Sequence, residues 1–397
     1  MHICFTTLNY SSRVSGGRNP SLEYISEELK RRGHLVTIVS TPSRIDFAQS
    51  KHEVVYTPTL KTPKSISGIY QIYRTTVKVH KGKKIDVIHA CNREIAGLAG
   101  VLFRRKYGVP LVVWMYDLGF ESQRFSLNVI HNPFIKFYLS TFYKIAQDFV
   151  LRSCDAITSI GPDITGVLKK NKMYHAKVFD IGNTVDIEKF SPNVDGSKVR
   201  RELLIGNIPL VTFIGTLNPM KGADIFIKAA SYISEAMGDV KFLIVGSVDK
   251  SFQSYERYLH KLAKELGLYH KIIFAGIRRD IPEIMAASDC VVSLNRHAAG
   301  GIGNTWLEAM ASGTPLVTSN VASARYIIKD HENGILVSNE NPYETANAVI
   351  EILKNKTLAR KIGENARLTV MNNFSVDIVT TKLLNVYKSL LEGRLRG

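Results

Sequence analysis

Cysteine is scarce in this sequence. The 397 residues include four cysteines, and their spacing matches no pattern of metal ligands. Three of the four fall in or beside predicted strands, which favours buried, reduced thiols over a disulfide framework. The four cysteines are Cys4, Cys91, Cys154 and Cys290. Their scarcity and spacing therefore favour a cytosolic protein.

Long apolar runs are also absent. No stretch approaches the roughly 20 consecutive apolar residues that a membrane-spanning helix needs. The N-terminus enters a predicted strand with no basic leader before it. We therefore expect a soluble cytoplasmic protein, and peripheral attachment at the inner membrane face stays open as an alternative.

Acidic residues are fewer than basic ones. The chain has 52 Lys and Arg against 35 Asp and Glu, a formal net charge of +17. Most of the excess lies in residues 1–190, which hold 27 basic and 15 acidic side chains. Such a surface attracts nucleic acid, anionic membranes or acidic small molecules. No nucleic-acid-binding motif accompanies the charge, so we expect an acidic small molecule or an anionic membrane surface, and no nucleic acid.

Short apolar runs alternate with helical patterns along the chain. In the first half we expect strands at residues 3–7, 36–40, 54–56, 86–90, 111–115, 156–159 and 178–181. In the second half we expect them at residues 210–214, 241–245, 272–275, 290–294 and 316–318. This alternation is typical of doubly wound parallel sheets. The sequence therefore predicts an α/β protein with two Rossmann-like halves that face each other across a cleft.

Loop-forming residues between Asn183 and Arg200 separate the two patterns. A chain of this length suggests two domains of about 200 residues each. We therefore predict a first domain at residues 1–190 and a second at residues 191–375. Residues 342–371 are expected to be helical throughout, and a helix within residues 376–397 is expected to pack back on the first domain.

A glycine-rich turn stands between the predicted strand at 290–294 and a short helix. Gly301 and Gly303 would let the backbone come close to a ligand. The N–H groups that begin the helix, near Asn304 and Thr305, suit a phosphate. Glu308 follows about one turn into the helix, where it can accept hydrogen bonds from hydroxyl groups. This arrangement describes a diphosphate with a polyhydroxylated neighbour.

The same residues also fit a structural role without a ligand. Thr305 and Glu308 have the spacing of a capping box, in which two side chains satisfy the helix's own first N–H groups. Gly313 fits an ordinary C-terminal helix cap. The residues alone leave both interpretations open.

The segment from Leu307 to Pro315 resembles a known family signature. Retaining glycosyltransferases of the GT-B fold, family 4, commonly read Glu-Gly-Phe-Gly-x4-Glu-Ala-Met-Ala-x-Gly-x-Pro at this point. Here Gly300 takes the place of the first glutamate, and Asn304 follows Gly303. Other motifs similar to the family's recur in order over nearly the whole chain, at residues 16–17, 32–37, 180–192, 215–222 and 333–337.

The resemblance implies a binding site for a nucleotide sugar. Lys221 follows the first strand of the second domain, where an ammonium can neutralise a diphosphate. A solvated loop lysine is the alternative. Glu308 would hold the ribose hydroxyls, and Arg296 would face the donor. The remaining residues that the resemblance places around the nucleotide sugar are Gly16, Gly17, Thr216, Gly301, Gly303, Asn304 and Thr305.

Two further positions depart from the family pattern. Thr216 stands where the family normally has an arginine on the phosphates. Tyr116 stands where many relatives have a histidine that touches the sugar. Tyr116 can donate one hydrogen bond but cannot act as a base near neutral pH. Tyr116 therefore either lines the donor pocket or simply caps its strand. We count it with the catalytic residues on the first interpretation. The next residue, Asp117, is expected to be structural.

Together these features predict a glycosyltransferase. A sugar would pass from a UDP- or GDP-sugar to a saccharide or lipid-linked acceptor, with retention and without a metal ion or cofactor. The first domain would bind the acceptor and the second the nucleotide sugar. Two alternatives stay open: a nucleotide-sugar-binding module that has lost turnover, and a sugar-nucleotide epimerase or hydrolase.

Residues 132–152 place several aromatic and aliphatic side chains on one helical stripe. The stripe holds Phe134, Phe137, Tyr138, Phe142, Ile145 and Phe149, with Lys136, Lys144 and Arg152 beside it. A helix of the core gives this pattern, and so does a helix that lies on a membrane surface. Basic clusters at residues 80–84 and 104–106 favour the membrane, so both interpretations stay open.

Overall fold

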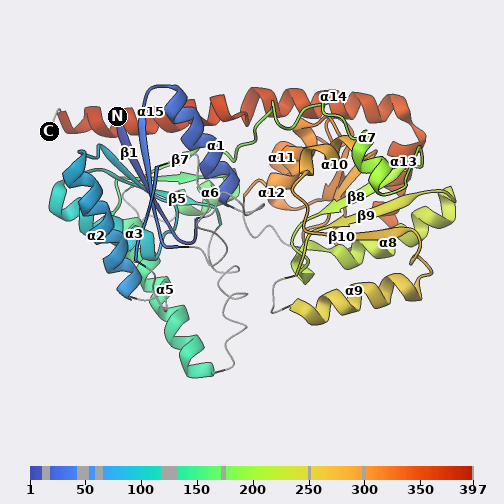
Figure 1. Cartoon of the computed structure of the whole chain (residues 1–397), viewed down its shortest axis with the longest axis horizontal. Helices are drawn as coiled ribbons and strands as arrows, with labels where there is room; N and C mark the ends of the chain where they lie inside the picture. Colours follow the sequence, from blue (N-terminus) through green and yellow to red (C-terminus); the bar gives the residue numbers. More distant parts are fainter. Residues whose placement is uncertain are drawn as a thin grey trace. The chain divides into compact units, whose positions relative to one another are not determined.

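The structure is a computed structural model that describes residues 1–10, 18–42, 53–58, 66–117, 132–170, 176–248, 252–296 and 301–395. The contacts within it divide the chain into two compact units (Figure 1). The first contains Met1–Asn183, Val376–Gly397 and the short segment Ala299–Gly301. The second contains Thr184–Ala298 and Ile302–Ser375.

The described part of the first unit is built on a seven-stranded parallel sheet with the order β3-β2-β1-β4-β5-β6-β7. The central strands β1, β4 and β5 are buried along their whole length because helices cover both faces of the sheet. The strands are β1 (His2–Thr7), β2 (Leu35–Ser40), β3 (Glu53–Tyr56), β4 (Val87–Ala90), β5 (Leu111–Met115), β6 (Ala156–Ser159) and β7 (Lys177–Asp180).

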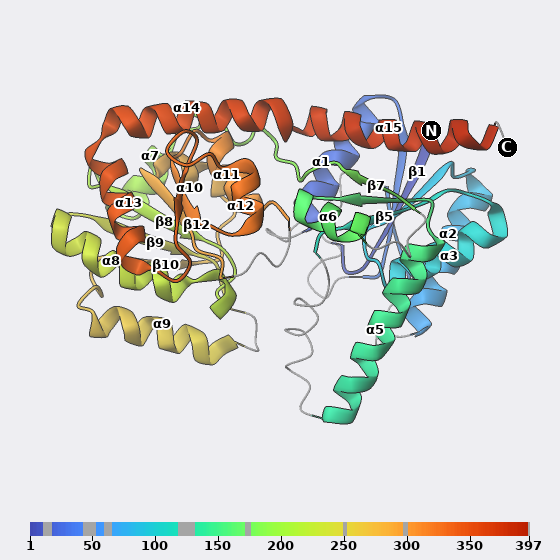
Figure 2. The same ribbon diagram turned by 180° about the vertical axis from the view of Figure 1, so that it is seen from behind.

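Two groups of helices cover this sheet. Helices α2 (Ile66–Gly82), α3 (Ile95–Tyr107) and α5 (Pro133–Ser153) lie together on one face, and α1 (Arg18–Arg31) lies with α15 (Val376–Leu395) on the other (Figures 1 and 2). Helix α6 (Pro162–Lys170) connects β6 to β7.

Helix α15 is joined to the first unit by polar contacts. The Arg32 guanidinium lies 2.8 Å from the Asp377 carboxylate. The Tyr387 hydroxyl lies 2.6 Å from Nδ1 of His89, whose imidazole is fully buried in β4. Burial lowers the pKa of His89 to about 3, so the imidazole is neutral at physiological pH. The final helix therefore belongs to the core of the first unit.

The second unit has a six-stranded parallel sheet with the order β10-β9-β8-β11-β12-β13. Its strands are β8 (Leu210–Ile214), β9 (Lys241–Val245), β10 (Ile272–Gly276), β11 (Cys290–Ser293), β12 (Leu316–Ser319) and β13 (Ile335–Val337). Its helices are α7 (Ser197–Glu202), the 3-10 turn η1 (Pro219–Lys221), α8 (Ala223–Met237), α9 (Gln253–Glu265), α10 (Ile281–Ala287), α11 (Asn304–Ala311), α12 (Ala322–Ile327), α13 (Pro342–Lys354) and α14 (Lys356–Asn373).

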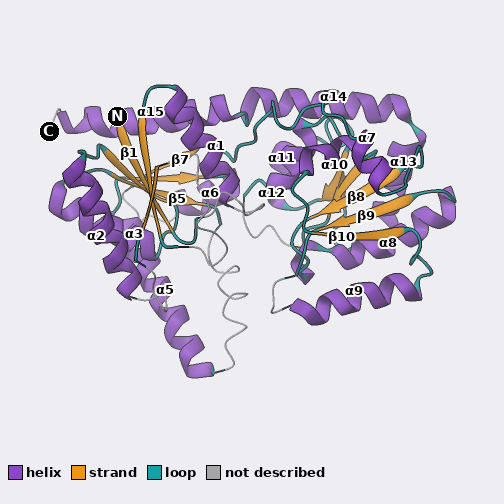
Figure 3. Cartoon of the chain, in the orientation of Figure 1, coloured by secondary structure: helices purple, strands orange, loops and turns teal. Residues whose placement is uncertain are grey.

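The predicted doubly wound parallel sheets are confirmed in both units, and Figure 3 shows strands flanked by helices in each. Every predicted strand is present, and β13 was not predicted. The expectation of one continuous helix over 342–371 is wrong. The Asn355 side chain accepts a hydrogen bond from the Leu358 N–H, so α13 ends and a new helix begins there.

The division between the units falls between residues 183 and 184, at the start of the predicted 183–200 loop and seven residues before the predicted end of the first domain. Val185 forms a bridge with Ser375, and the Thr184 hydroxyl donates to the Phe374 carbonyl. These contacts join the segment after Asn183 to the second unit.

All four cysteines are buried and free, as expected. Burial raises the pKa of the Cys4 and Cys154 thiols to about 12, so neither reacts as a thiolate at neutral pH. Among the helices that the structure describes, none combines the length and the apolar character needed to cross a membrane.

Candidate functional site

The glycine-rich turn leads from β11 into α11, as the sequence predicted. The N-cap residue is Gly303, and Thr305 lies inside the helix. A capping box requires its threonine at the N-cap, so the capping-box interpretation of Thr305 and Glu308 is wrong. The first turn of α11 therefore begins directly after a residue with no side chain, where the backbone is accessible to a ligand.

Helix α11 is fixed at both ends. The buried indole of Trp306 donates to the Ser293 hydroxyl at 3.0 Å, which ties the first turn to the end of β11. At the other end Gly313 adopts a φ of +69°, and its N–H bonds to the Met310 carbonyl at 3.1 Å. The predicted glycine cap at Gly313 is thus confirmed.

Glu308 has an unusual environment for a carboxylate. Its side chain is half-buried, and the carboxylate has no hydrogen-bond or ion-pair partner among the described residues. Burial raises the pKa of Glu308 to about 7, against the smaller opposing effect of the charge on Lys189. The carboxylate is therefore available to accept hydrogen bonds from a ligand, and such bonds would favour its charged form.

Lys221 ends the η1 turn that follows β8. Its side chain is exposed, and its ammonium makes no ion pair within the described ranges. Protein packed around the group nevertheless lowers the pKa of Lys221. Gly222 comes next with a φ of +73°, and a Cβ there would lie 2.2 Å from the Leu294 carbonyl oxygen. Glycine at this position lets the Pro219–Lys221 turn, which we call the lysine turn, lie against the end of β11.

Arg296 follows β11 and is held by protein acceptors. Its guanidinium contacts both carboxylate oxygens of Asp224, at 2.7 and 3.0 Å. It also donates to Glu340 and to the Pro219 carbonyl. These partners raise the pKa of Arg296 well above its ordinary value, chiefly through the hydrogen bonds to Asp224. Arg296 therefore joins the β11 loop to the lysine turn, and most of its donors are already used.

Asp224 also accepts a hydrogen bond from the Tyr255 hydroxyl at 2.7 Å. Neither Asp224, Tyr255 nor Glu340 was among the predicted site residues. Their one sequence signal is the position of Asp224, directly after the Lys-Gly pair.

The glycines of the site differ in why they are needed. A Cβ at Gly301, which groups with the first unit, would lie 2.5 Å from the Ile160 carbonyl oxygen of that unit, so packing alone requires glycine. At Gly303 a Cβ would meet only the Trp306 ring, at an ordinary 3.5 Å. Neither packing nor backbone conformation therefore requires glycine at Gly303.

Most of the predicted donor residues lie at one edge of the second-unit sheet. Parallel strands end at a common edge, and β8 and β11 are neighbours. The exposed Thr216 and Lys221 follow β8. Arg296 and the α11 segment, which carries Gly303, Asn304, Thr305 and Glu308, follow β11. Gly16, Gly17 and Gly300 lie outside the described residues.

Tyr116 lies at the corresponding edge of the first-unit sheet, directly after β5. Its ring stacks on Trp114, with centroids 4.7 Å apart. Asp117 contacts the buried Arg93 guanidinium at 2.8 Å, and Arg93 also lies 3.1 Å from Glu94. Asp117 thus belongs to a structural ion network, as expected. The structure leaves both interpretations of Tyr116 open.

Two family models match the chain. Residues 197–369 match the model described as glycosyl transferases group 1, and residues 15–189 match the model described as glycosyltransferase family 4. The chain belongs to the group 1 glycosyltransferases of family 4. The resemblance read from the signature is thereby confirmed. The assignments of single residues to the donor site stay predictions.

Two curated relatives illustrate the range of this glycosyltransferase family. One is a UDP-Gal:alpha-D-GlcNAc-diphosphoundecaprenol alpha-1,3-galactosyltransferase of Escherichia coli, 26% identical over 356 residues, 86% of this chain and 85% of the relative. The other is an uncharacterized glycosyltransferase of Methanocaldococcus jannaschii, 27% identical over 414 residues, 99% of each chain.

Solved structures agree on the fold. The glycosyltransferase is similar to HepE of Anabaena, crystallised in complex with UDP and glucose, with a TM-score of 0.78 and 22% identity. The match covers 98% of this chain and 99% of HepE. At this identity the likeness establishes the GT-B fold and leaves the donor and acceptor undetermined.

Proposed function

We propose that the protein transfers a sugar from a nucleoside diphosphate sugar to a saccharide or lipid-linked acceptor, with retention of anomeric configuration. One observation carries the proposal. A cation at Lys221 and a carboxylate at Glu308, neither paired with a described residue, follow neighbouring strands at the sheet edge where helix α11 begins after Gly303. A nucleoside diphosphate offers a partner to each of these groups.

The chemistry needs charge compensation at the departing diphosphate. In this proposal, Lys221 and the first N–H groups of α11 stabilise the negative charge that grows as the glycosidic bond to the sugar breaks. Groups fixed before the reaction stabilise such charge most effectively, because they need not reorganise. Glu308 accepts hydrogen bonds from the ribose hydroxyls and so orients the nucleotide. With an ammonium and a helix start in these roles, we propose that transfer needs no divalent metal.

The relatives support a choice of substrates within this class. The Escherichia coli relative is named for UDP-galactose as donor and for a lipid-linked diphosphate acceptor. HepE was crystallised with UDP and glucose. We therefore propose a UDP-sugar as the first donor to test, a GDP-sugar as the second, and a polyprenyl diphosphate saccharide as the first acceptor.

The test is an assay for free nucleoside diphosphate with several UDP- and GDP-sugars, each with and without saccharide and lipid-linked acceptors. We expect release that depends on an acceptor, and a product whose anomeric configuration by NMR equals that of the donor. Nucleotide release without an acceptor product would instead indicate a hydrolase. Binding without release in every mixture would indicate a module without turnover. Gly300, Thr216 and Tyr116 replace the residues that the family commonly has at these positions, which is the observation that favours this second candidate.

A further inference from the structure

Three helices on one side of the first-unit sheet form a surface with a distinctive composition. Helices α2, α3 and α5 pack side by side, and both views show them together on the face opposite α1 and α15 (Figures 1 and 2). The N-terminal half of α5 extends beyond the other two helices. We refer to the exposed side of these helices as the α2–α3–α5 face.

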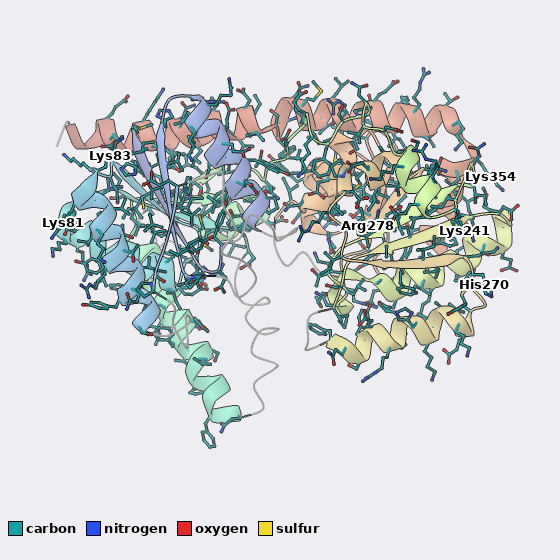
Figure 4. The ribbon with its side chains drawn as sticks, viewed as in Figure 1. Lys81, Lys83, Lys241, His270, Arg278 and Lys354 are labelled. Atoms are coloured by element: carbon teal, nitrogen blue, oxygen red, sulfur yellow. The ribbon has the colours of Figure 1, made fainter. Side chains whose placement is uncertain are left out.

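The α2–α3–α5 face is strongly basic. The three helices contain nine Lys and Arg side chains and one acidic side chain, the half-buried Asp148. Lys83 and Lys84 follow directly after α2, and Figure 4 shows Lys81 and Lys83 at the outer edge of the unit. The exposed cations of the three helices are Arg74, Lys78, Lys81, Arg105, Lys106, Lys144 and Arg152.

The same face exposes large apolar side chains. On α5 the exposed fractions are 83% for Phe134, 73% for Phe137, 64% for Ile145 and 40% for Phe149. These positions follow one another at helical spacing and form a single stripe. The helix packs on α3 through a different side, where the Val150 methyl group meets Gly97. A core location for these four side chains is therefore wrong.

The apolar stripe and the cations are in direct contact. The Arg105 guanidinium lies over the Phe149 ring, 5.2 Å from its centroid. On α2 the Arg74 guanidinium lies over the exposed Tyr70 ring at 5.6 Å. Long basic side chains can cover apolar surface with their methylene groups while their charges reach anionic groups above. The face therefore combines charge and apolar surface in one layer.

We propose that the α2–α3–α5 face docks onto the surface of an anionic lipid bilayer. The cations would contact lipid phosphates, and the α5 stripe would insert among the headgroups and the first methylene groups. Charge complementarity favours this occupant, because the seven exposed cations among the described side chains of these helices match an anionic surface. The exposed phenylalanines favour a bilayer over nucleic acid, because a bilayer also solvates apolar side chains.

Vesicle co-sedimentation of the full-length protein tests the proposal without any sugar nucleotide. The probes are vesicles of phosphatidylcholine alone and vesicles that also contain phosphatidylglycerol. We expect binding only when phosphatidylglycerol is present, and weaker binding at higher salt because the charges are screened. Binding that ignored lipid charge, or no binding at all, would overturn the proposal.

Two pairs of variants separate the two contributions. Phe134→Ser with Phe137→Ser, and Arg105→Glu with Lys106→Glu, should each weaken vesicle binding by about tenfold or more. All four side chains are exposed, so the fold should persist. The matched controls lie on the second unit, where all four side chains are also exposed. Leu204→Ser with Ile277→Ser matches the phenylalanine pair, and Arg257→Glu with Lys264→Glu matches the charge pair. Both control variants should bind vesicles like the wild type.

Other partners of the face would give different results. A protein dimer that the phenylalanine variants dissociate would assign the face to self-association, and salt-sensitive RNA binding lost in the charge variants would assign it to nucleic acid. Either result without vesicle binding would overturn the proposal. Because vesicle binding is measured without donor or acceptor, its failure would leave the proposed sugar transfer intact, and the reverse also holds.

Discussion

Glu308 is the side chain whose surroundings say most about a ligand. Most half-buried carboxylates in proteins accept hydrogen bonds, because an unpaired one is costly to ionise. Glu308 has no such partner in the described structure, and its pKa rises to about 7. Groups with strongly shifted pKa values concentrate at functional sites. The free protein thus bears a cost at Glu308 that a bound polyhydroxylated ligand would offset.

Replacing Glu308 with glutamine should stabilise the free protein above pH 7 and change it little near pH 4. Between the ordinary value of 4.5 and the folded value of about 7, the folded protein retains a proton that the unfolded chain has lost. The wild type's free energy of unfolding therefore falls as pH rises through this window, and the variant lacks this fall. Urea titrations at several pH values measure both.

The matched control for this comparison is Glu235→Gln, at an exposed position on α8. Its stability should follow that of the wild type across the same pH range. If Glu308→Gln also followed the wild type at every pH, the carboxyl group of Glu308 would titrate normally and the argument from its surroundings would fail.

Sequence motifs can nominate some candidate site residues and not others. Lys221 and Glu308 belong to motifs with fixed local spacing, so the sequence nominates both. Arg296 is nominated too, but its role is not, because the acceptors that hold it are brought close only by the fold. Asp224 lies 72 residues before it in the chain, and Glu340 lies 44 residues after it.

Among the secondary-structure elements, strands were the most predictable. Strands that helices cover on both faces tend to appear in the sequence as short apolar runs. Every strand predicted from such a run is present in the structure. Strand β13, at Ile335–Val337, was not predicted. The break between α13 and α14 was missed because the amphipathic pattern continues through Asn355. Only the cap formed by its side chain reveals a new helix.

The surface of α5 shows a limit of pattern analysis. A stripe of phenylalanines at helical spacing fits a core helix and a membrane-surface helix equally well. Exposure distinguishes them, and exposure depends on which neighbours the fold supplies. In the structure, Ala146, Val150 and Leu151 face the core, and the phenylalanine stripe does not.

Two glycines with a left-handed backbone test how the Pro219–Lys221 turn is positioned. Gly222→Ala should destabilise the protein more than Gly108→Ala, although both residues adopt the left-handed helical conformation, with φ values of +73° and +69° and open space beside Gly108. Both variants carry strain of about 1 kcal/mol from the left-handed backbone. Only the Gly222 variant also meets the Leu294 carbonyl, which adds about 1–3 kcal/mol of overpacking. Urea unfolding measures both.

Displacement of the lysine turn should also weaken nucleotide binding in the Gly222 variant alone. Equal destabilisation in the two variants, with unchanged nucleotide affinity, would mean that the close contact between the turn and β11 has no role in the site.

For the whole molecule, chain length predicted two domains, and the alternation of strand and helix patterns predicted an α/β fold in each. Both sheets are present, and the family models divide the chain in the same order. The division falls at the start of the predicted 183–200 loop because the pairing of Val185 with Ser375 joins residues 190 positions apart. The composition of the loop itself does not predict a contact between residues so far apart in the chain. The donor, the acceptor and the membrane surface stay proposals about the molecule as a whole.

The central claim is that Lys221 holds the diphosphate of a nucleotide at the edge of the second-unit sheet. Calorimetric titration of UDP and GDP tests it most directly, with the wild type, Lys221→Met, and Lys228→Met as a control at an exposed position on the adjoining helix α8. We predict saturable binding that Lys221→Met weakens by about 1–3 kcal/mol, or roughly 5- to 150-fold, while Lys228→Met binds like the wild type. Unchanged affinity of the Lys221 variant for both nucleotides would contradict the account.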